Sequence, residues 1–119
     1  MKNKVEVGKR GENFAAEFLK EKGYEILEMN FRIAGGEIDI VAKEKEEIVF
    51  VEVKSREFDE DFDIFSSISG RKRLSLLKTC RIWLLKNNLQ DISWRIDFIG
   101  IILKQGRVVK VEHLEGGIF

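Results

Sequence analysis

The segment GGEIDIVAKEKEEIVFVEVKSR, residues 35–56, decides the fold, because it predicts two strands joined by a charged turn. The strands are expected over residues 37–42 and 48–54, with the turn at residues 43–47. Polar side chains interrupt the apolar runs where a sheet would pack its core: Glu37, Asp39, Glu52 and Lys54. These four residues need an explanation that strand propensity does not supply.

A turn centred between Lys45 and Glu46 fixes the pairing of the two strands. It places Asp39 opposite Glu52, Glu37 opposite Lys54, and Val41 opposite Phe50. Since side chains alternate between the two faces of a strand, the three acids and the lysine share one face. The other face then carries only apolar residues and is expected to be core: Ile38, Ile40, Val51 and Val53.

This pairing predicts a site for a hard divalent cation. Directly opposed residues have Cβ atoms about 5 Å apart, so Asp39 and Glu52 repel each other unless a positive charge lies between them. Magnesium accepts oxygen ligands at about 2.1 Å and fits between two such groups. Lys54, roughly 7 Å along the strand from Glu52, reaches the rim of this site. A metal and an amine so arranged suit phosphodiester hydrolysis.

Spacing alone leaves a second interpretation open, in which the hairpin is a solvated face with cross-strand ion pairs. Two features favour the metal site. Val41 and Phe50 share the face with the acids, so it is not simply exposed to solvent. Glu12 lies on the edge of the apolar arc of the preceding helix, which brings one more carboxylate toward the sheet.

The rest of the chain completes a mixed α/β fold. Helical periodicity predicts helices over residues 9–22 and 71–87. Further strands are expected over residues 24–31, 94–103 and 107–114, and a polar loop over residues 55–70. The order is therefore α-β-β-β-α-β with an extra terminal strand. A crossover through the second helix should lay the fourth strand parallel to the third.

Composition indicates one globular domain over residues 1–119, with 44% hydrophobic and 35% charged residues. No apolar run is long enough to span a bilayer and no signal-peptide core is present, so no membrane association is expected. The one cysteine, Cys80, is compatible with a cytoplasmic location and is expected to be a buried small hydrophobe.

Overall charge gives no reason to expect nucleic acid, since 21 basic residues balance 21 acidic ones. Locally, four cations lie near one edge of the predicted fold and could hold a nucleic-acid backbone: Arg56, Arg71, Lys72 and Arg73. Cations at a helix N-terminus oppose the helix dipole, which favours a functional interpretation. Ordinary solubilising charge is the alternative.

The residues Asp39, Glu52, Val53 and Lys54 resemble the PD-(D/E)xK nuclease motif in its form without the proline. More closely, the chain resembles the YraN-like family of predicted restriction-endonuclease-like proteins, which are related to Holliday junction resolvases. The matching segments are GKRGENFAAEFLKEKGYEIL, NFRIAGGEIDIVA, IVFVEVKSR, the region of Lys72, RIDFIGI and VEHLEGGIF. Together they cover nearly the whole chain. The segment EFDEDFDIFSSISG departs from the family pattern.

The resemblance implies a restriction-endonuclease-like core and a Mg²⁺- or Mn²⁺-dependent endonuclease acting on DNA, with branched or flapped structures as candidate substrates. It implies that Asp39, Glu52 and the Val53 carbonyl bind the metal, that Glu12 assists, and that Lys54 is the catalytic lysine. Resolvase relatives work in pairs, which suggests a homodimer. No small-molecule cofactor is expected. The alternative is a nuclease-fold module that binds nucleic acid or a repair partner without cutting.

Other motifs carry weaker signals. Asp59, Asp61 and Asp63 imitate an EF-hand loop but lack its glycine and its closing glutamate, so an acidic loop is expected. A lone histidine, His113, is expected to make a structural hydrogen bond. Trp83 and Trp94 are expected in the core.

Overall fold

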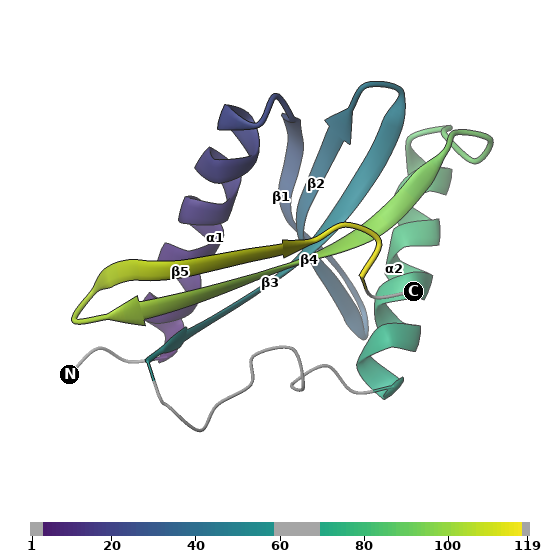
Figure 1. The fold of residues 1–119 in the computed structure, drawn as a ribbon. Helices are drawn as coiled ribbons and strands as arrows, with labels where there is room; N and C mark the ends of the chain where they lie inside the picture. Colours follow the sequence, from purple (N-terminus) through teal and green to yellow (C-terminus); the bar gives the residue numbers. More distant parts are fainter. Residues whose placement is uncertain (1–3, 59–69, 118–119) are drawn as a thin grey trace.

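The computed structural model describes residues 4–58 and 70–117, and it contains one five-stranded sheet with a helix on each face (Figure 1). Its elements are α1 (Lys4–Glu21), β1 (Glu25–Ile33), β2 (Gly36–Glu44), β3 (Glu47–Glu57), α2 (Gly70–Lys86), β4 (Trp94–Lys104) and β5 (Arg107–Leu114). The strands lie in chain order across the sheet. Neighbouring strands are antiparallel except β3 and β4, which are parallel. The predicted mixed α/β fold and its element order are confirmed.

The predicted boundaries need small corrections. α1 begins at Lys4 rather than Lys9, so that Val7 is buried with the rest of its apolar face. β3 continues to Glu57, and the loop predicted over residues 55–70 is shorter at its start. The acidic motif at residues 59–63 lies outside the described residues.

Two apolar clusters hold the sheet between the helices. One cluster joins α1 to the sheet through Ala15, Leu19 and Val51, and the other joins α2 through Trp83 and Phe50. Cys80 and Trp83 are buried in the second cluster, as expected, and Trp94 packs against it. Both faces of the central strands are therefore core, which explains why β2, β3 and β4 are nearly continuous apolar runs.

The β2–β3 hairpin has the predicted register. Val41 pairs with Phe50, and the turn contains only Lys45 and Glu46 between the paired residues Glu44 and Glu47. Lys45 has a positive φ of 54°, as a two-residue hairpin turn of this kind requires. The ladder ends at the pair Ile40–Val51, and β2 and β3 separate beyond it. The two pairs expected beyond this point, Asp39 with Glu52 and Glu37 with Lys54, are therefore not formed as backbone pairs.

The expected face of Ile38 is wrong. Alternation places Ile38 and Ile40 on one face, but Ile38 packs in the α2 cluster and Ile40 in the α1 cluster. The paired strand β1 changes face at the same level, since Met29 packs against the α1 cluster and Phe31 belongs to the α2 cluster. Asn30, between them, has a left-handed φ of 55°. A local kink at this level thus interrupts the two-residue period.

Neither helix in residues 4–58 and 70–117 is long and apolar enough to cross a bilayer. The one histidine makes the structural hydrogen bond expected of it. His113 Nε2 lies 2.8 Å from Oδ2 of the buried Asp97, which Arg95 also contacts.

Candidate functional site

Asp39 lies at the kink, where β2 leaves β3. Its Oδ2 accepts a hydrogen bond of 2.7 Å from the backbone N–H of Val53. The carboxylate thus takes the place that a backbone carbonyl of β2 would have had in a continuous ladder. Because the N–H and C=O of one strand residue point to the same neighbouring strand, the Val53 carbonyl also faces the Asp39 side of β3.

Glu52 is the second buried acid of the site. Asp39 and Glu52 are each only 5% exposed. Alternation puts Glu52 on the same face as Phe50, under α2. On that helix, the pKa of Cys80 is raised mainly by burial and further by the charge of Glu52. Asp39 and Glu52 therefore meet at the gap between β2 and β3, and they do not emerge on opposite faces of the hairpin.

The two carboxylates interact strongly. Burial raises the pKa of Asp39 most, and the charge of Glu52 raises it further, while the hydrogen bond from Val53 lowers it. The charges of Glu12 and Glu37 add to the increase. Folding has thus brought negative groups into a poorly hydrated place, an arrangement that costs stability unless a cation compensates it.

Glu12 on α1 is close enough to these acids to interact with their charges. It is half-buried, and its pKa is raised by burial and then by the charge of Glu37, while a hydrogen bond with Asn30 lowers it. The charge of Glu52 also raises it. The residue that marks the kink in β1 thus also positions this third carboxylate.

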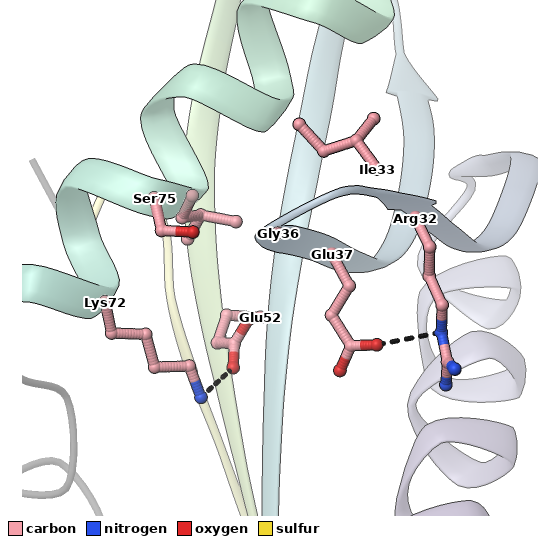
Figure 2. Close-up of a pocket in the computed structure, with 8 residues that line it drawn as sticks. Arg32, Ile33, Gly36, Glu37, Glu52, Lys72 and Ser75 are labelled. Atoms are coloured by element: carbon pink, nitrogen blue, oxygen red, sulfur yellow. Dashed lines mark ion pairs between the residues drawn. The ribbon is translucent and has the colours of Figure 1, made fainter.

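A cleft of about 380 Å³ opens over the site between the β1–β2 turn and the start of α2 (Figure 2). Glu37 and Glu52 line it together with Arg32, Lys72 and Ser75. Figure 2 shows Lys72 reaching Glu52 from α2, and Arg32 reaching Glu37 from β1. The nitrogen–oxygen distances are 2.7 Å and 3.0 Å. Cations therefore flank the acids on two sides.

Close packing of α2 against the β1–β2 turn fixes one wall of this cleft. Ser75 Oγ donates a 2.6 Å hydrogen bond to the carbonyl of Gly35, whose φ of 84° suits glycine. A Cβ on Gly36 would collide with Oγ1 of Thr79. Gly35 therefore supplies the left-handed backbone conformation of the turn, and Gly36 lets the helix approach it closely.

The residues of the predicted basic cluster do not all line the cleft. Lys72 lies in the cleft, whereas Arg73 and Arg56 are exposed, and the side chain of Arg71 is outside the described part. Lys54 is half-buried and shares the Glu52 face by alternation. It forms no ion pair with any residue that the structure describes. The pairing of Lys72 with Glu52 and the contribution of Asn30 were not predicted from the sequence.

The donor set suits a hard divalent cation bound largely by water. Asp39 and Glu52 supply two buried, mutually repelling carboxylates, and the Val53 carbonyl faces the same gap. Within residues 4–58 and 70–117, no three acidic, histidine or cysteine side chains converge as a ready metal cage. Magnesium does not need such a cage, because it keeps several waters and uses one or two carboxylates. The residues therefore fit a metal of this type.

Comparison with known proteins places the chain in a family. Residues 11–101 match the model of the uncharacterised protein family UPF0102. A UPF0102 protein of Carboxydothermus hydrogenoformans is 42% identical over 106 residues, which cover 88% of this chain and 89% of the relative. A UPF0102 protein of Moorella thermoacetica is 43% identical over 110 residues, which cover 92% of each chain. The chain therefore belongs to the UPF0102 family.

Proposed function

We propose that this protein is a metal-dependent endonuclease that hydrolyses phosphodiester bonds in DNA. The observation that carries the proposal is the buried pair Asp39 and Glu52, which meet where two strands separate under a cleft with cationic walls. Stability alone does not favour two buried carboxylates, one of which raises the pKa of the other. A divalent cation gives this arrangement a use.

The proposed metal ligands are Asp39, Glu52 and the Val53 carbonyl, with Mg²⁺ or Mn²⁺ as the ion. Glu12 assists from α1, with its carboxylate placed by Asn30. When bound, such an ion polarises a phosphoryl oxygen and lowers the pKa of a bound water. Asp39 is oriented for this role by Val53, whose N–H holds one carboxylate oxygen and leaves the other for a ligand.

Lys54 is the proposed catalytic lysine. It lies two residues beyond Glu52 on the same strand, and no described acid neutralises it. Its ammonium can orient the attacking water and stabilise the charge that develops on the phosphate as the bond from phosphorus to the leaving oxygen breaks. Arg32 and Lys72 on the cleft walls can hold neighbouring phosphates.

The finer assignments go with this function. We propose that the α-β-β-β-α-β core is of the restriction-endonuclease-like type, that branched or flapped DNA is the preferred substrate, and that the protein works as a homodimer in the cytoplasm. Arg56, Arg71 and Arg73 extend the proposed DNA surface beyond the cleft. The exposure of Arg56 and Arg73 is compatible with phosphate contacts.

A DNA-binding module that does not cut is the second candidate. The observation in its favour is that Lys72 already neutralises Glu52 without a metal. The two functions separate in one experiment, in which labelled branched, flapped, single-stranded and duplex DNA is incubated with Mg²⁺ or Mn²⁺ and resolved by denaturing electrophoresis. A binding module would shift the mobility of the DNA in native gels and leave every strand intact.

Variants sharpen this experiment. Lys54→Ala should retain metal binding and lose cutting, whereas Asp39→Asn should lose both. Lys43→Ala is the matched control, because Lys43 is also a half-buried strand lysine and lies at the other end of the same hairpin. Cutting that survives Lys54→Ala at the wild-type rate would contradict the proposed role of this lysine.

A further inference from the structure

Among the residues that the structure describes, the cation paired with the buried Glu52 comes from the helix and not from the strand that carries Lys54. Lys72 Nζ lies 2.7 Å from Oε1 of Glu52, whose side chain is 6% exposed, against 42% for the lysine. Burial lowers the pKa of Lys72, but the hydrogen bond and charge of Glu52 outweigh it and raise that pKa. The charges of Asp39 and Glu37 act in the same direction.

Helix stability does not explain a lysine at this position. Lys72 is in the first turn of α2, where the helix dipole disfavours a positive charge, and that turn contains no acidic residue. The following turns of α2 are held against the β1–β2 turn by the hydrogen bond of Ser75 with Gly35 and by the close approach of Gly36 to Thr79. The backbone of α2 is therefore fixed close to the sheet, and the flexible side chain of Lys72 stays within reach of Glu52.

We propose that Lys72 is a resident counter-ion that a divalent cation displaces from Glu52, and that the displaced ammonium then holds a substrate phosphate in the same cleft. The inference rests on the proposed function. A metal bound to Glu52 repels the ammonium, and the four-carbon stem of lysine lets it move without moving the helix. Its new partner is an anion, and DNA phosphate is the anion that the proposed reaction supplies.

Exchange of this kind makes metal and DNA binding cooperative. Without metal, Lys72 is engaged by Glu52 and contributes little to phosphate binding. With metal, it contributes one phosphate contact. Linkage then requires that DNA strengthen metal binding by the same factor by which metal strengthens DNA binding. The site would thereby load its metal most firmly when substrate is present.

The first test measures Mg²⁺ affinity by isothermal titration calorimetry in the absence of DNA. Lys72→Met removes the competing charge and keeps the length of the side chain, so affinity should rise roughly tenfold, as for loss of one charge-assisted hydrogen bond. Lys72→Arg keeps the charge and should stay near wild type. Unchanged or weaker Mg²⁺ affinity in Lys72→Met would overturn the proposal.

Two controls separate exchange from a general change in charge. Lys78→Met removes a lysine from the same helix on its exposed side. Arg32→Met removes a cation from the same cleft that contacts Glu37 instead of Glu52. Both should change Mg²⁺ affinity much less than Lys72→Met. An equal increase in Arg32→Met would show that bulk charge, not exchange at Glu52, sets the affinity.

The second test measures the salt dependence of DNA binding, with Lys54→Ala as the background to prevent cutting. In Mg²⁺, adding Lys72→Met should reduce the slope of log affinity against log salt by about 0.9, the value for one duplex phosphate contact. In EDTA the slope should barely change. A slope that is equally reduced in both conditions would mean that Lys72 contacts DNA without any exchange.

The outcomes distinguish this inference from the function on which it rests. If wild type binds Mg²⁺, Asp39→Asn does not, and Lys72→Met behaves like wild type, only the exchange is wrong. If wild type and Asp39→Asn both fail to bind Mg²⁺, the proposed function and the exchange are both wrong. Circular dichroism and thermal unfolding of Lys72→Met and Lys72→Arg confirm that each variant is folded.

Discussion

Replacing Asp39 by asparagine should stabilise the metal-free protein at alkaline pH. Asparagine removes the negative charge that the Glu52 carboxylate repels. Its side-chain oxygen can still accept the hydrogen bond from the backbone N–H of Val53. Its amide can in addition donate to the Glu52 carboxylate. A substitution at the proposed metal site would thus make the fold more stable, as expected where function has been favoured over stability.

The magnitude follows from the titration of Asp39. Burial and the charge of Glu52 raise the pKa of Asp39 from 3.8 to about 8. Each pH unit between the folded and unfolded pKa values corresponds to about 1.4 kcal/mol, which sets a ceiling of about 6 kcal/mol. Because water and Lys72 can rearrange around the ionised group, we expect roughly half of this, about 3 kcal/mol.

The sign follows from the protons bound in each state. Between pH 4 and pH 8 the folded chain holds a proton on Asp39 that the unfolded chain has lost, so wild-type stability falls relative to Asp39→Asn as pH rises. The difference should be near zero below pH 4 and constant above about pH 8.

Urea unfolding followed by circular dichroism, in EDTA and at pH 4 to 9, measures this difference. Asp91→Asn is the control, because Asp91 is exposed, and its curve should parallel that of wild type. If the unfolding free energy of Asp39→Asn varies with pH in parallel with that of wild type, or is lower than that of wild type at pH 9, the inferred repulsion between the buried carboxylates is refuted.

Three further predictions concern the frame that holds the site. Asp97→Ala removes a fully buried acid that pairs with Arg95 and His113. The unfolding free energy, measured by urea unfolding, should therefore fall by about 3–5 kcal/mol. A loss below about 1 kcal/mol would contradict this. Gly36→Ala should lower the unfolding free energy by about 1–3 kcal/mol, because the added Cβ collides with Thr79 Oγ1. If that contact is the cause, adding Thr79→Ala to the same chain should restore much of the lost stability. Cys80 is buried, and burial raises the pKa of its thiol, so it should resist Ellman's reagent until the protein unfolds; fast reaction in the native state would contradict its placement.

The hairpin could be predicted from the sequence because local chemistry determines it. A charged turn between two apolar runs sets the register, and the observed pair Val41–Phe50 confirms it. The parallel arrangement of β3 and β4 follows from the helix between them. These features depend on turn residues and on periodicity, which one sequence displays directly.

Features that depend on tertiary contacts could not be predicted in this way. The kink at Asn30 and Asp39 breaks the two-residue period, so alternation assigned Ile38 to the wrong face. The pairing of Lys72 with Glu52 depends on where α2 lies on the sheet, which the sequence does not display. Basic residues at a helix start indicated a functional surface but did not say which of them enters the cleft.

Cleavage of branched and duplex DNA by purified wild type and Lys54→Ala, side by side in Mg²⁺ and in EDTA, tests the central claim most directly. The claim predicts strand scission by wild type in Mg²⁺, none in EDTA, and none by Lys54→Ala, although this variant still binds Mg²⁺. Intact DNA in every lane, with Mg²⁺ binding absent from both proteins, would contradict it.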